Sequence, residues 1–290
     1  MPDASQTVSD VIHAHFGALT RAEKQLAESL LENYPVSGLG SITTIAENAR
    51  VSTPTVVRMV QKLGYKGYPE FQAHLHQELE ATISNPIAKH DRWMSKAPQG
   101  HVLNRIADSI MSNMRETLGD LDTATFDGAA ELLSDRKRSV YLVGGRITGS
   151  IAEYLFTHMQ VIRAKTTLMS SHSSSWPQYV LNMNAGDVLV IFDIRRYEQE
   201  MVTLAEVAKA NGVIIILFTD QWGSPAAKHA RHVFRVRIEV PSAWDSSVVT
   251  LFVVEALIEA VQTRSWDETR ERMRTLEGLF EQTRLFRKHG

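Results

Sequence analysis

The chain contains no cysteine. This excludes a disulfide framework, a thiolate metal site and a cysteine nucleophile. No apolar run approaches the roughly 18 residues that a membrane-spanning helix needs, and the opening stretch MPDASQTVSD lacks the apolar segment of a secretory signal. The formal net charge of −2 gives the chain no overall attraction to nucleic acid. We therefore expect a soluble cytoplasmic protein without membrane contact, in which any polyanion must bind a local basic patch.

The 290 residues are enough for two domains, each with its own core. Helical patterns fill the first part of the chain. They weaken around Asn85–Gly100, where prolines and mixed charge are typical of a linker. From about His101, helical patterns lead into short β-branched runs. The predicted organisation is a helical domain over residues 1–84, a linker over 85–100, an α/β domain over 101–264 and a C-terminal helix over 265–290.

Residues 41–71 predict two short helices joined by a tight turn. Ser41 is expected to cap the first helix, which runs to about Ala49. Ser52 is expected to cap the second, with Pro54 in the first turn, where its missing N–H costs nothing. The apolar residues of the second helix recur at helical spacing and predict a buried stripe, formed by Val56, Val60 and Leu63.

The opposite face of the second helix is hydroxylated and basic. No acidic residue occurs between Arg50 and Lys66. Small hydroxyls at the start of a helix, with basic residues further along, suit a DNA major groove and its flanking phosphates. The predicted DNA-contacting residues are Ser52, Thr53, Thr55, Arg58, Lys62 and Lys66. The alternative is an ordinary helical hairpin with a solvated basic face.

A long stretch of this half resembles a known family. Residues 19–35 and 42–79 resemble the N-terminal domain of the RpiR/MurR transcriptional regulators, whose signature reads roughly V-S-x-x-T-V-x-R-x-x-x-K-L-G-[FY]-x-G-[FY]-x-x-[FL]. The matching residues are Val51, Ser52, Thr55, Val56, Arg58, Lys62, Leu63, Gly64, Tyr65, Gly67, Tyr68 and Phe71. The turn departs from the family at Arg50, where glycine is usual, so we expect backbone strain or an added phosphate contact there.

The second half predicts an α/β fold. Five short apolar runs alternate with helical stretches, which predicts a doubly wound parallel sheet covered on both faces. The expected strands are Val140–Val143, Thr166–Met169, Val188–Phe192, Val213–Phe218 and His232–Val236. Ligands of such sheets bind at the carboxyl ends of the strands, at a topological switch point.

This half resembles the SIS (sugar isomerase) domain, a flavodoxin-like fold that RpiR/MurR regulators carry after their helix-turn-helix. VYLVGGRITGSIAEYL is similar to the element G-x-G-x-S-x-x-x-A, with Thr148 in the serine place and Arg146 where the motif has a second glycine. Sugar-phosphate-binding SIS domains have S-x-S-G-E-T after the third strand. This chain has DIRRYE at residues 193–198, so both serines, the glycine and the threonine of that phosphate-binding motif are replaced.

The altered segment nevertheless predicts an anion site, because two arginines can bind an anion bidentately in place of the hydroxyls. The serine-rich residues 170–175 follow the second strand, and they either line the same cleft or form a plain loop. The predicted effector-binding residues are Gly145, Arg146, Thr148, Ser171, Ser173, Asp193, Arg195 and Arg196. The alternative for Asp193, Arg195 and Arg196 is a structural salt-bridge cluster. His172 could donate a hydrogen bond at this rim, and Trp244 is expected to fill the core.

Two functions compete. One is a DNA-binding transcriptional regulator whose SIS domain senses a sugar phosphate or other anionic metabolite; the other is a sugar-phosphate isomerase with an appended helical domain. Isomerisation needs a base beside a carbonyl, but the candidate bases fall in no recognisable catalytic spacing; they are Glu153, Glu198, Glu206, Glu255 and His172.

We predict the regulator, not an enzyme, with no cofactor and no metal. Its partners would be a double-stranded DNA operator and, as the resemblance implies, a second copy in a homodimer or homotetramer. Apolar residues at helical spacing in Trp266–Phe286 would suit that assembly, or would pack back on the same subunit.

Overall fold

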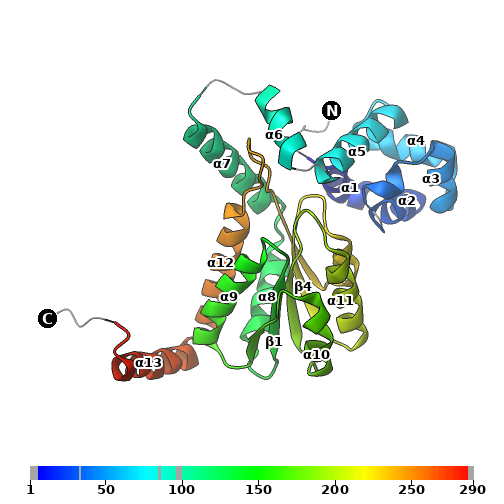
Figure 1. Cartoon of the computed structure of the whole chain (residues 1–290). Coiled ribbons are helices and arrows are strands. Elements are labelled where there is room, and N and C mark those ends of the chain that lie inside the picture. The colour runs from blue at the N-terminus through cyan, green and yellow to red at the C-terminus, as the bar shows by residue number, and fades with distance from the viewer. Residues whose placement is uncertain (1–5, 33, 84–85, 96–99, 287–290) are drawn as a thin grey trace.

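A computed structural model describes residues 6–32, 34–83, 86–95 and 100–286. A small helical domain is followed by an α/β domain, and a last helix leads away from it (Figure 1). The predicted fold class, a helix-turn-helix domain before a parallel-sheet domain, is confirmed. Within the described part of the chain, no helix has both the length and the apolarity to cross a membrane.

The helical domain encloses a core of its own. Its elements are α1 (Val8–His15), η1 (Phe16–Ala18), α2 (Arg21–Glu32), η2 (Val36–Gly38), α3 (Ile42–Asn48), α4 (Thr53–Lys62) and α5 (Tyr68–Ile83). The predicted stripe of α4 is confirmed, because Val56, Val60 and Leu63 are all buried against residues of α1, α2, α3 and α5. Thr20 and Glu23 form the capping box of α2, since each side chain accepts a hydrogen bond from the other's backbone N–H.

The turn between α3 and α4 has the expected position. Ser41 caps α3 by accepting a hydrogen bond from the Thr44 N–H at 3.1 Å. Arg50 has a φ of 52°, in the left-handed region that favours glycine, as the departure from the family pattern predicted. Ser52 precedes α4, but its hydroxyl bonds the Thr55 hydroxyl at 2.9 Å instead of a backbone N–H. The side-chain cap predicted for Ser52 is therefore wrong.

The expected linker contains a helix. Helix α6 (Pro86–Ser95) lies between the two domains, and α7 (Val102–Asp120) and α8 (Thr123–Ser134) follow before the sheet. Proline at the start of a helix is compatible with it, because the first N–H groups of a helix have no partner within it. Residues 84–85 and 96–99 of this segment lie outside the described residues.

The sheet has five parallel strands in the order β2-β1-β3-β4-β5. They are β1 (Val140–Gly144), β2 (Thr166–Leu168), β3 (Val188–Phe192), β4 (Ile214–Asp220) and β5 (His232–Val236). This is the flavodoxin-like order. Strand β2 lies on one side of β1, and β3 to β5 follow on the other side, so the topological switch point is between β1 and β3. All five predicted strands are present. Strand β4 extends two residues beyond its predicted end at Phe218, which carries Asp220 to the carboxyl edge of the sheet.

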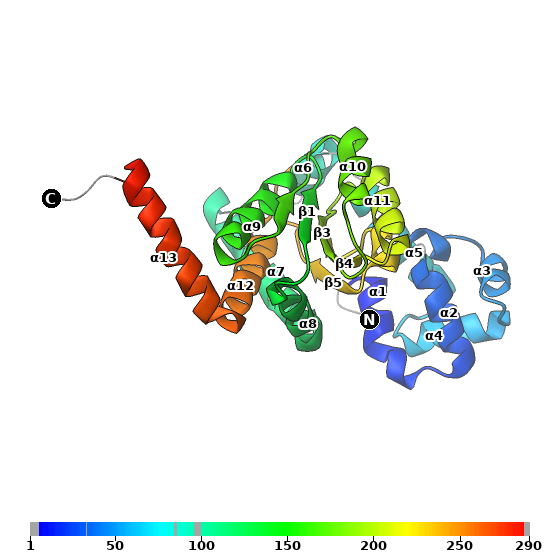
Figure 2. The ribbon, with the colours of Figure 1, turned by 90° about the horizontal axis from the view of Figure 1, so that it is seen from below.

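Helices cover both faces of the sheet (Figures 1 and 2). On one face lie α7, α8, α9 (Gly149–Ile162) and α12 (Val248–Arg264). On the other lie η3 (Ser173–Ser175), α10 (Trp176–Leu181), α11 (Gln199–Ala210) and η4 (Pro225–His229). The rings of Phe192, Phe218 and Phe234 stack across three adjacent strands, with centroids 4.6 Å apart at each step. The connection between β4 and β5 contains the short 3₁₀ turn η4.

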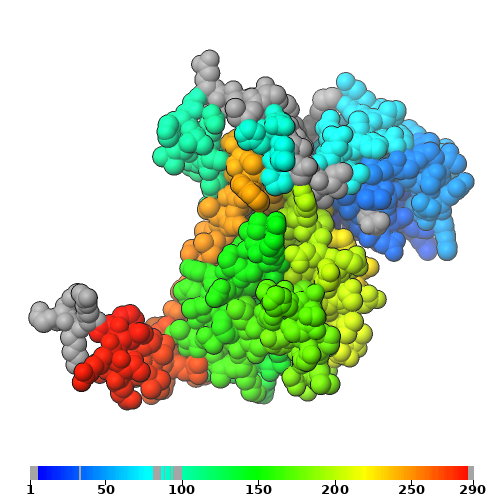
Figure 3. Space-filling model, in the orientation of Figure 1, coloured from blue at the N-terminus to red at the C-terminus, as the bar shows by residue number. Residues whose placement is uncertain are grey.

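The last helix, α13 (Trp266–Thr283), stands out from the body of the molecule (Figures 2 and 3). It is attached to α9, where Arg272 donates hydrogen bonds to the backbone oxygens of Gln160 and Val161. Leu279 remains largely exposed, and Met273, Leu276 and Phe280 are only half-buried. A single subunit therefore leaves much of this apolar face uncovered.

A buried arginine joins the loops at the amino-terminal edge of the sheet. The Arg163 side chain donates to the backbone oxygens of Leu133 at 2.6 Å, Ala164 at 3.1 Å and Arg138. We expect Arg163→Met to lower the free energy of unfolding by about 2–4 kcal/mol, because three carbonyls lose their donor. Urea unfolding measures this, with the exposed Arg231→Met as control. A loss below about 0.5 kcal/mol, typical of surface changes, would show that water replaces the guanidinium.

Candidate functional site

The predicted DNA-contacting residues surround the turn and the exposed side of α4. Ser52, Arg58, Lys62 and Lys66 are exposed, and Thr53 is half-buried. Gln61 is exposed between Arg58 and Lys62 on the same helix and was missed by the sequence reasoning. The sequence feature that points to Gln61 is its place one helical turn after Arg58, on the same side of the helix. A glutamine side chain can hydrogen-bond the edge of an adenine.

Thr55 has a different position from the one expected. It is buried, and its hydroxyl bonds Ser52 and accepts a hydrogen bond from Arg58 Nη2 at 3.4 Å. An enclosed hydroxyl does not reach a base, so we reassign Thr55 from a DNA contact to a residue that positions Arg58. The helical period accounts for this, because Thr55 precedes Val56 and Met59 on the inward side of α4.

Lys62 is held by the protein itself. Its ammonium group lies 2.7 Å from Glu23 Oε2 and donates to the Ala18 oxygen at 3.3 Å. Burial would raise the pKa of Glu23, but hydrogen bonds from Lys62 and Thr20 bring it below its ordinary value. Lys62 thus joins α4 to α2, and its charge is partly neutralised before any phosphate approaches.

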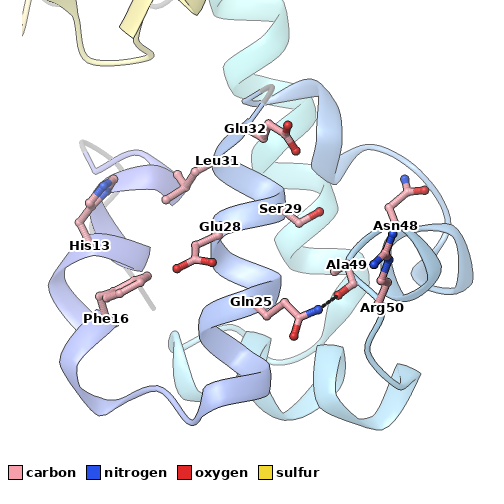
Figure 4. Close-up of a pocket in the computed structure, with 10 residues that line it drawn as sticks. All are labelled: His13, Phe16, Gln25, Glu28, Ser29, Leu31, Glu32, Asn48, Ala49 and Arg50. Carbon is pink, nitrogen blue, oxygen red and sulfur yellow. Dashed lines mark hydrogen bonds between the residues drawn. The ribbon is translucent and has the colours of Figure 1, made fainter. Parts of the chain in front are cut away.

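A wide hollow of about 790 Å³ lies elsewhere on the helical domain, between α1, α2 and the α3–α4 turn (Figure 4). Gln25 Nε2 donates to the Ala49 oxygen at 2.9 Å on its floor, which fixes the turn against α2. The carboxylates of Glu28 and Glu32 line it with a single arginine, Arg50. This charge does not suit a DNA backbone, so the hollow is not part of the basic face.

At the switch point of the sheet, Thr148 closes the loop after β1. Its hydroxyl donates to the Phe192 oxygen and accepts from the Gly145 N–H, both at 2.8 Å. A Cβ on Gly144 would lie 2.5 Å from the Thr148 oxygen, so only glycine fits there. Thr148 stands in the serine place of the SIS motif, but its hydroxyl is used to bind β1 to β3.

Asp193 lies directly after β3 and is enclosed. It accepts hydrogen bonds from the Ser224 hydroxyl and from the Glu198 N–H at 3.2 Å. Burial raises the pKa of Asp193 to about 7, although these two hydrogen bonds oppose that shift. The side chain holds the segment 193–198 to the loop before η4, and it does not contact Arg195 or Arg196 in any described ion pair.

Arg195 belongs to an ion-pair network. Its guanidinium lies over the Trp222 ring, 4.3 Å from the centroid, and donates to Asp245 at 2.6 and 3.1 Å. Glu239 is 3.6 Å away, and Lys89 of α6 binds the same Asp245 carboxylate. The salt-bridge alternative thus describes Arg195, but its partners are Asp245 and Glu239, not Asp193.

The Glu198 carboxylate lies beside the loop after β1, at the place where the sequence predicts a bound anion. Its Oε1 accepts a hydrogen bond from the Arg146 N–H at 3.2 Å and would lie 2.6 Å from a Cβ on Gly145. A carboxylate of the protein therefore lies against the backbone of the loop between β1 and α9. The sequence reasoning had weighed Glu198 as a catalytic base, whereas its place in the phosphate-binding motif was the better signal.

The remaining predicted side chains are exposed around this edge. Arg146 and Arg196 extend from the loops after β1 and β3, and Ser171 and Ser173 lie in the loop after β2. The hydrogen bonds of that serine loop are local, such as Ser175 Oγ to the His172 oxygen. The structure thus brings Gly145, Arg146, Thr148, Asp193 and Glu198 together and directs Arg195 elsewhere.

The core position expected for Trp244 is wrong, since 56% of its surface is exposed. Its neighbour Asp245 carries the ion pairs with Arg195 and Lys89. The segment before α12 therefore holds charged groups in place and leaves its aromatic ring at the surface.

Asp193 should make the folded protein less stable as the pH rises. The folded state, with a pKa of about 7, keeps a proton that the unfolded state, near 3.8, has lost. The contribution of this group to the free energy of unfolding is fully present below about pH 4. It falls as the pH rises from there and is lost once the pH passes about 7. Asp193→Asn mimics the protonated acid, so it should gain up to about 4 kcal/mol over the parent between these pH values. Urea unfolding across this range measures the difference; parallel curves would show that Asp193 stays ionised.

Residues 7–82 match the helix-turn-helix domain of the rpiR family, and residues 132–260 match the SIS domain. The HTH-type transcriptional regulator HexR of Escherichia coli is 22% identical over 284 residues, which are 94% of each chain. HexR of Pseudomonas aeruginosa is 26% identical over 263 residues, or 87% of this chain and 88% of that protein.

Two solved structures share the fold. One is the sugar isomerase domain of an RpiR transcription factor from Sphaerobacter thermophilus, with 22% identity and a TM-score of 0.56, covering 62% of this chain and 99% of that one. The other is NanR of Vibrio vulnificus complexed with ManNAc-6P, with 18% identity and a TM-score of 0.54, covering 95% and 98%. The matches to both domains and the two regulators of similar length place the chain in a family. It belongs to the RpiR family of transcriptional regulators, with a helix-turn-helix domain followed by a SIS domain.

Proposed function

We propose that this regulator binds a double-stranded DNA operator through α4, in the bacterial cytoplasm, and that a small anionic metabolite at the carboxyl edge of its SIS sheet alters this binding. The observation that carries the proposal is the union in one chain of an exposed basic helix with a sheet edge bearing two exposed arginines, Arg146 and Arg196. The basic helix would supply the attraction to the DNA phosphates. The arginines at the sheet edge would bind the metabolite that regulates DNA binding.

Operator recognition would require two copies. A symmetric dimer presents two recognition helices to two half-sites of a near-palindrome. The uncovered face of α13, with Leu279 exposed and Phe280 half-buried, supports a partner subunit at that end of the molecule. A ligand that binds one arrangement of the subunits more tightly shifts the equilibrium between arrangements with different helix spacings. The size of that shift is limited by the difference between its two affinities.

The effector site we propose lies between the loops after β1 and β3. An incoming carboxylate or phosphate would displace the Glu198 carboxylate from the Arg146 N–H and would gain Arg146 and Arg196 as counter-charges. Thr148 and Asp193 would shape the loops without touching the ligand, because both are enclosed. The NanR complex with ManNAc-6P supports a phosphorylated sugar as one class to test.

The isomerase alternative is less well supported. A catalytic base must reach a proton on the substrate, and Glu198 is the candidate base that lies beside the loops after β1 and β3. Glu198 itself is bonded to the loop after β1. The relatives that match most of the chain are transcriptional regulators. Turnover of a sugar phosphate by the purified protein would reverse this assignment.

The DNA interface can be tested at Arg58. We expect Arg58→Ala to weaken operator binding by roughly 1–3 kcal/mol if the guanidinium reads a base. Gel-shift titration measures the loss, and Arg231→Ala, an exposed arginine of the SIS domain, is the matched control. Lys66→Ala should reduce the salt dependence by about one phosphate contact for all sequences alike. Lys62 is a poorer choice, because its loss also breaks the ion pair with Glu23. Equal affinities for the parent and both variants would exclude α4 as the reader.

The effector site can be tested with single variants of adjacent arginines. Inorganic phosphate and a panel of sugar phosphates and organic acids are first screened by thermal shift, since a bound ligand raises the melting temperature. For each hit, Arg196→Gln should weaken binding by about tenfold or more, through loss of one charged hydrogen bond. Glu198→Gln should strengthen it, because the competing charge is removed. Arg195→Gln should instead lower stability, because Asp245 and Glu239 lose the positive charge that Arg195 supplies. Calorimetry that finds parental affinity in both Arg196→Gln and Glu198→Gln would contradict the proposed site.

A further inference from the structure

A second hollow lies where the two domains meet. It encloses about 490 Å³ and is lined by Asp10 and His13 of α1, by the turn between α7 and α8, and by the end of β5. Figure 2 shows α1 beside β5 at this junction. The hollow is separate from the effector cleft, because no residue of the loops after β1 or β3 lines it.

Two arginines of one strand end line this hollow. Arg235 and Arg237 are two residues apart, so both side chains leave the extended backbone on the same side. Arg237 is fully engaged, since it binds Asp10 at 2.7 Å, Asp120 at 3.1 Å and Glu116 at 3.6 Å. Its pairing with Asp10 is also the ion pair that fastens α1 to the α/β domain.

Arg235 has no such partner. In the ranges 6–32, 34–83, 86–95 and 100–286 it makes no hydrogen bond or ion pair, and its Nε is buried without an acceptor. It packs against Gly223, where a Cβ would lie 3.4 Å from Nε. Burial lowers the pKa of Arg235, with the charge of Asp10 opposing that shift. An arginine stays protonated in proteins, so a half-buried cation lies here without a hydrogen-bonded counter-charge among the described residues.

The carboxylates that line the hollow make no ion pair with Arg235 and bind other donors. Asp10 is shared between Arg237 and the Thr7 N–H, and Asp120 binds Arg237. Asp122 caps α8 by accepting from the Ala124 and Thr125 N–H groups. Each of these carboxylates therefore already binds a donor. The guanidinium of Arg235 is the donor that lacks an acceptor in the described part of the hollow.

We propose that this interdomain hollow is a second anion-binding site, which takes a small phosphate- or carboxylate-bearing molecule on Arg235, with Arg237 as the second contact. Because the ligand shares Arg237 with Asp10, its binding competes with the ion pair that holds α1. Occupancy of the hollow is therefore linked to the docking of the DNA-binding domain, by thermodynamic reciprocity. The proposal does not depend on the effector cleft.

The experiment uses the full chain with two probes, inorganic phosphate and malonate, titrated by calorimetry at constant ionic strength. Arg235→Gln should weaken binding of at least one probe by about tenfold or more. Arg196→Gln, which alters only the cleft, should leave this binding class unchanged. Asp10→Asn should strengthen it severalfold, because it removes the competitor for Arg237.

Folding is controlled in the same set of proteins. Without probe, Arg235→Gln should melt at the parental temperature or above it, because it removes a half-buried charge that makes no ion pair. A lower melting temperature would mean that Arg235 serves the fold. The proposal is also overturned if neither probe binds at millimolar concentration, or if Arg235→Gln binds both as the parent does. Loss of all binding in Arg196→Gln alone would assign the probes to the cleft.

Discussion

The fully buried carboxylate of Asp220 organises the carboxyl edge of the sheet. It accepts hydrogen bonds from the Tyr197 hydroxyl at 2.5 Å, from the Arg195 N–H at 2.8 Å and from the Trp222 N–H at 3.0 Å. Burial raises its pKa, and these donors act against that shift. One side chain at the end of β4 thus fixes the segment after β3 and the loop that carries Trp222. A buried carboxylate without these donors would be strongly destabilising.

The consequence is a sheet edge whose charges are set by distant residues. With its backbone held by Asp220, Arg195 lies over Trp222 and binds Asp245. Arg196, the next residue, is left exposed. Two adjacent arginines with the same chemistry therefore have different surroundings: Arg195 completes a structural ion-pair network, and the side chain of Arg196 faces solvent. Glu198, three residues after Arg195, adds the protein's own carboxylate against the loop after β1.

Sequence reasoning succeeded where the signal is local. The apolar runs predicted all five strands, and the spacing of Val56, Val60 and Leu63 predicted the buried side of α4. It failed where a partner lies far along the chain. Arg195 and Asp245 are separated by 50 residues and Lys62 and Glu23 by 39, so no periodicity connects them. Pro86 was read as part of a linker although it begins a helix, because proline is equally suited to both positions.

The same network reaches the segment between the domains. Asp245 binds both Arg195, which follows β3, and Lys89 of α6. A movement of the segment after β3 would therefore change the surroundings of the carboxylate that Lys89 binds. A second contact, between Arg237 and Asp10, holds α1 to the end of β5. Both connections are ion pairs with little exposure, where the loss of one partner leaves the other uncompensated. Such pairs have two discrete states, made or broken. Coupling between two sites requires an element of that kind, which both sites bias. At the end of β5, the helix-turn-helix domain is thus joined to the α/β domain by a buried ion pair that can be made or broken as a unit.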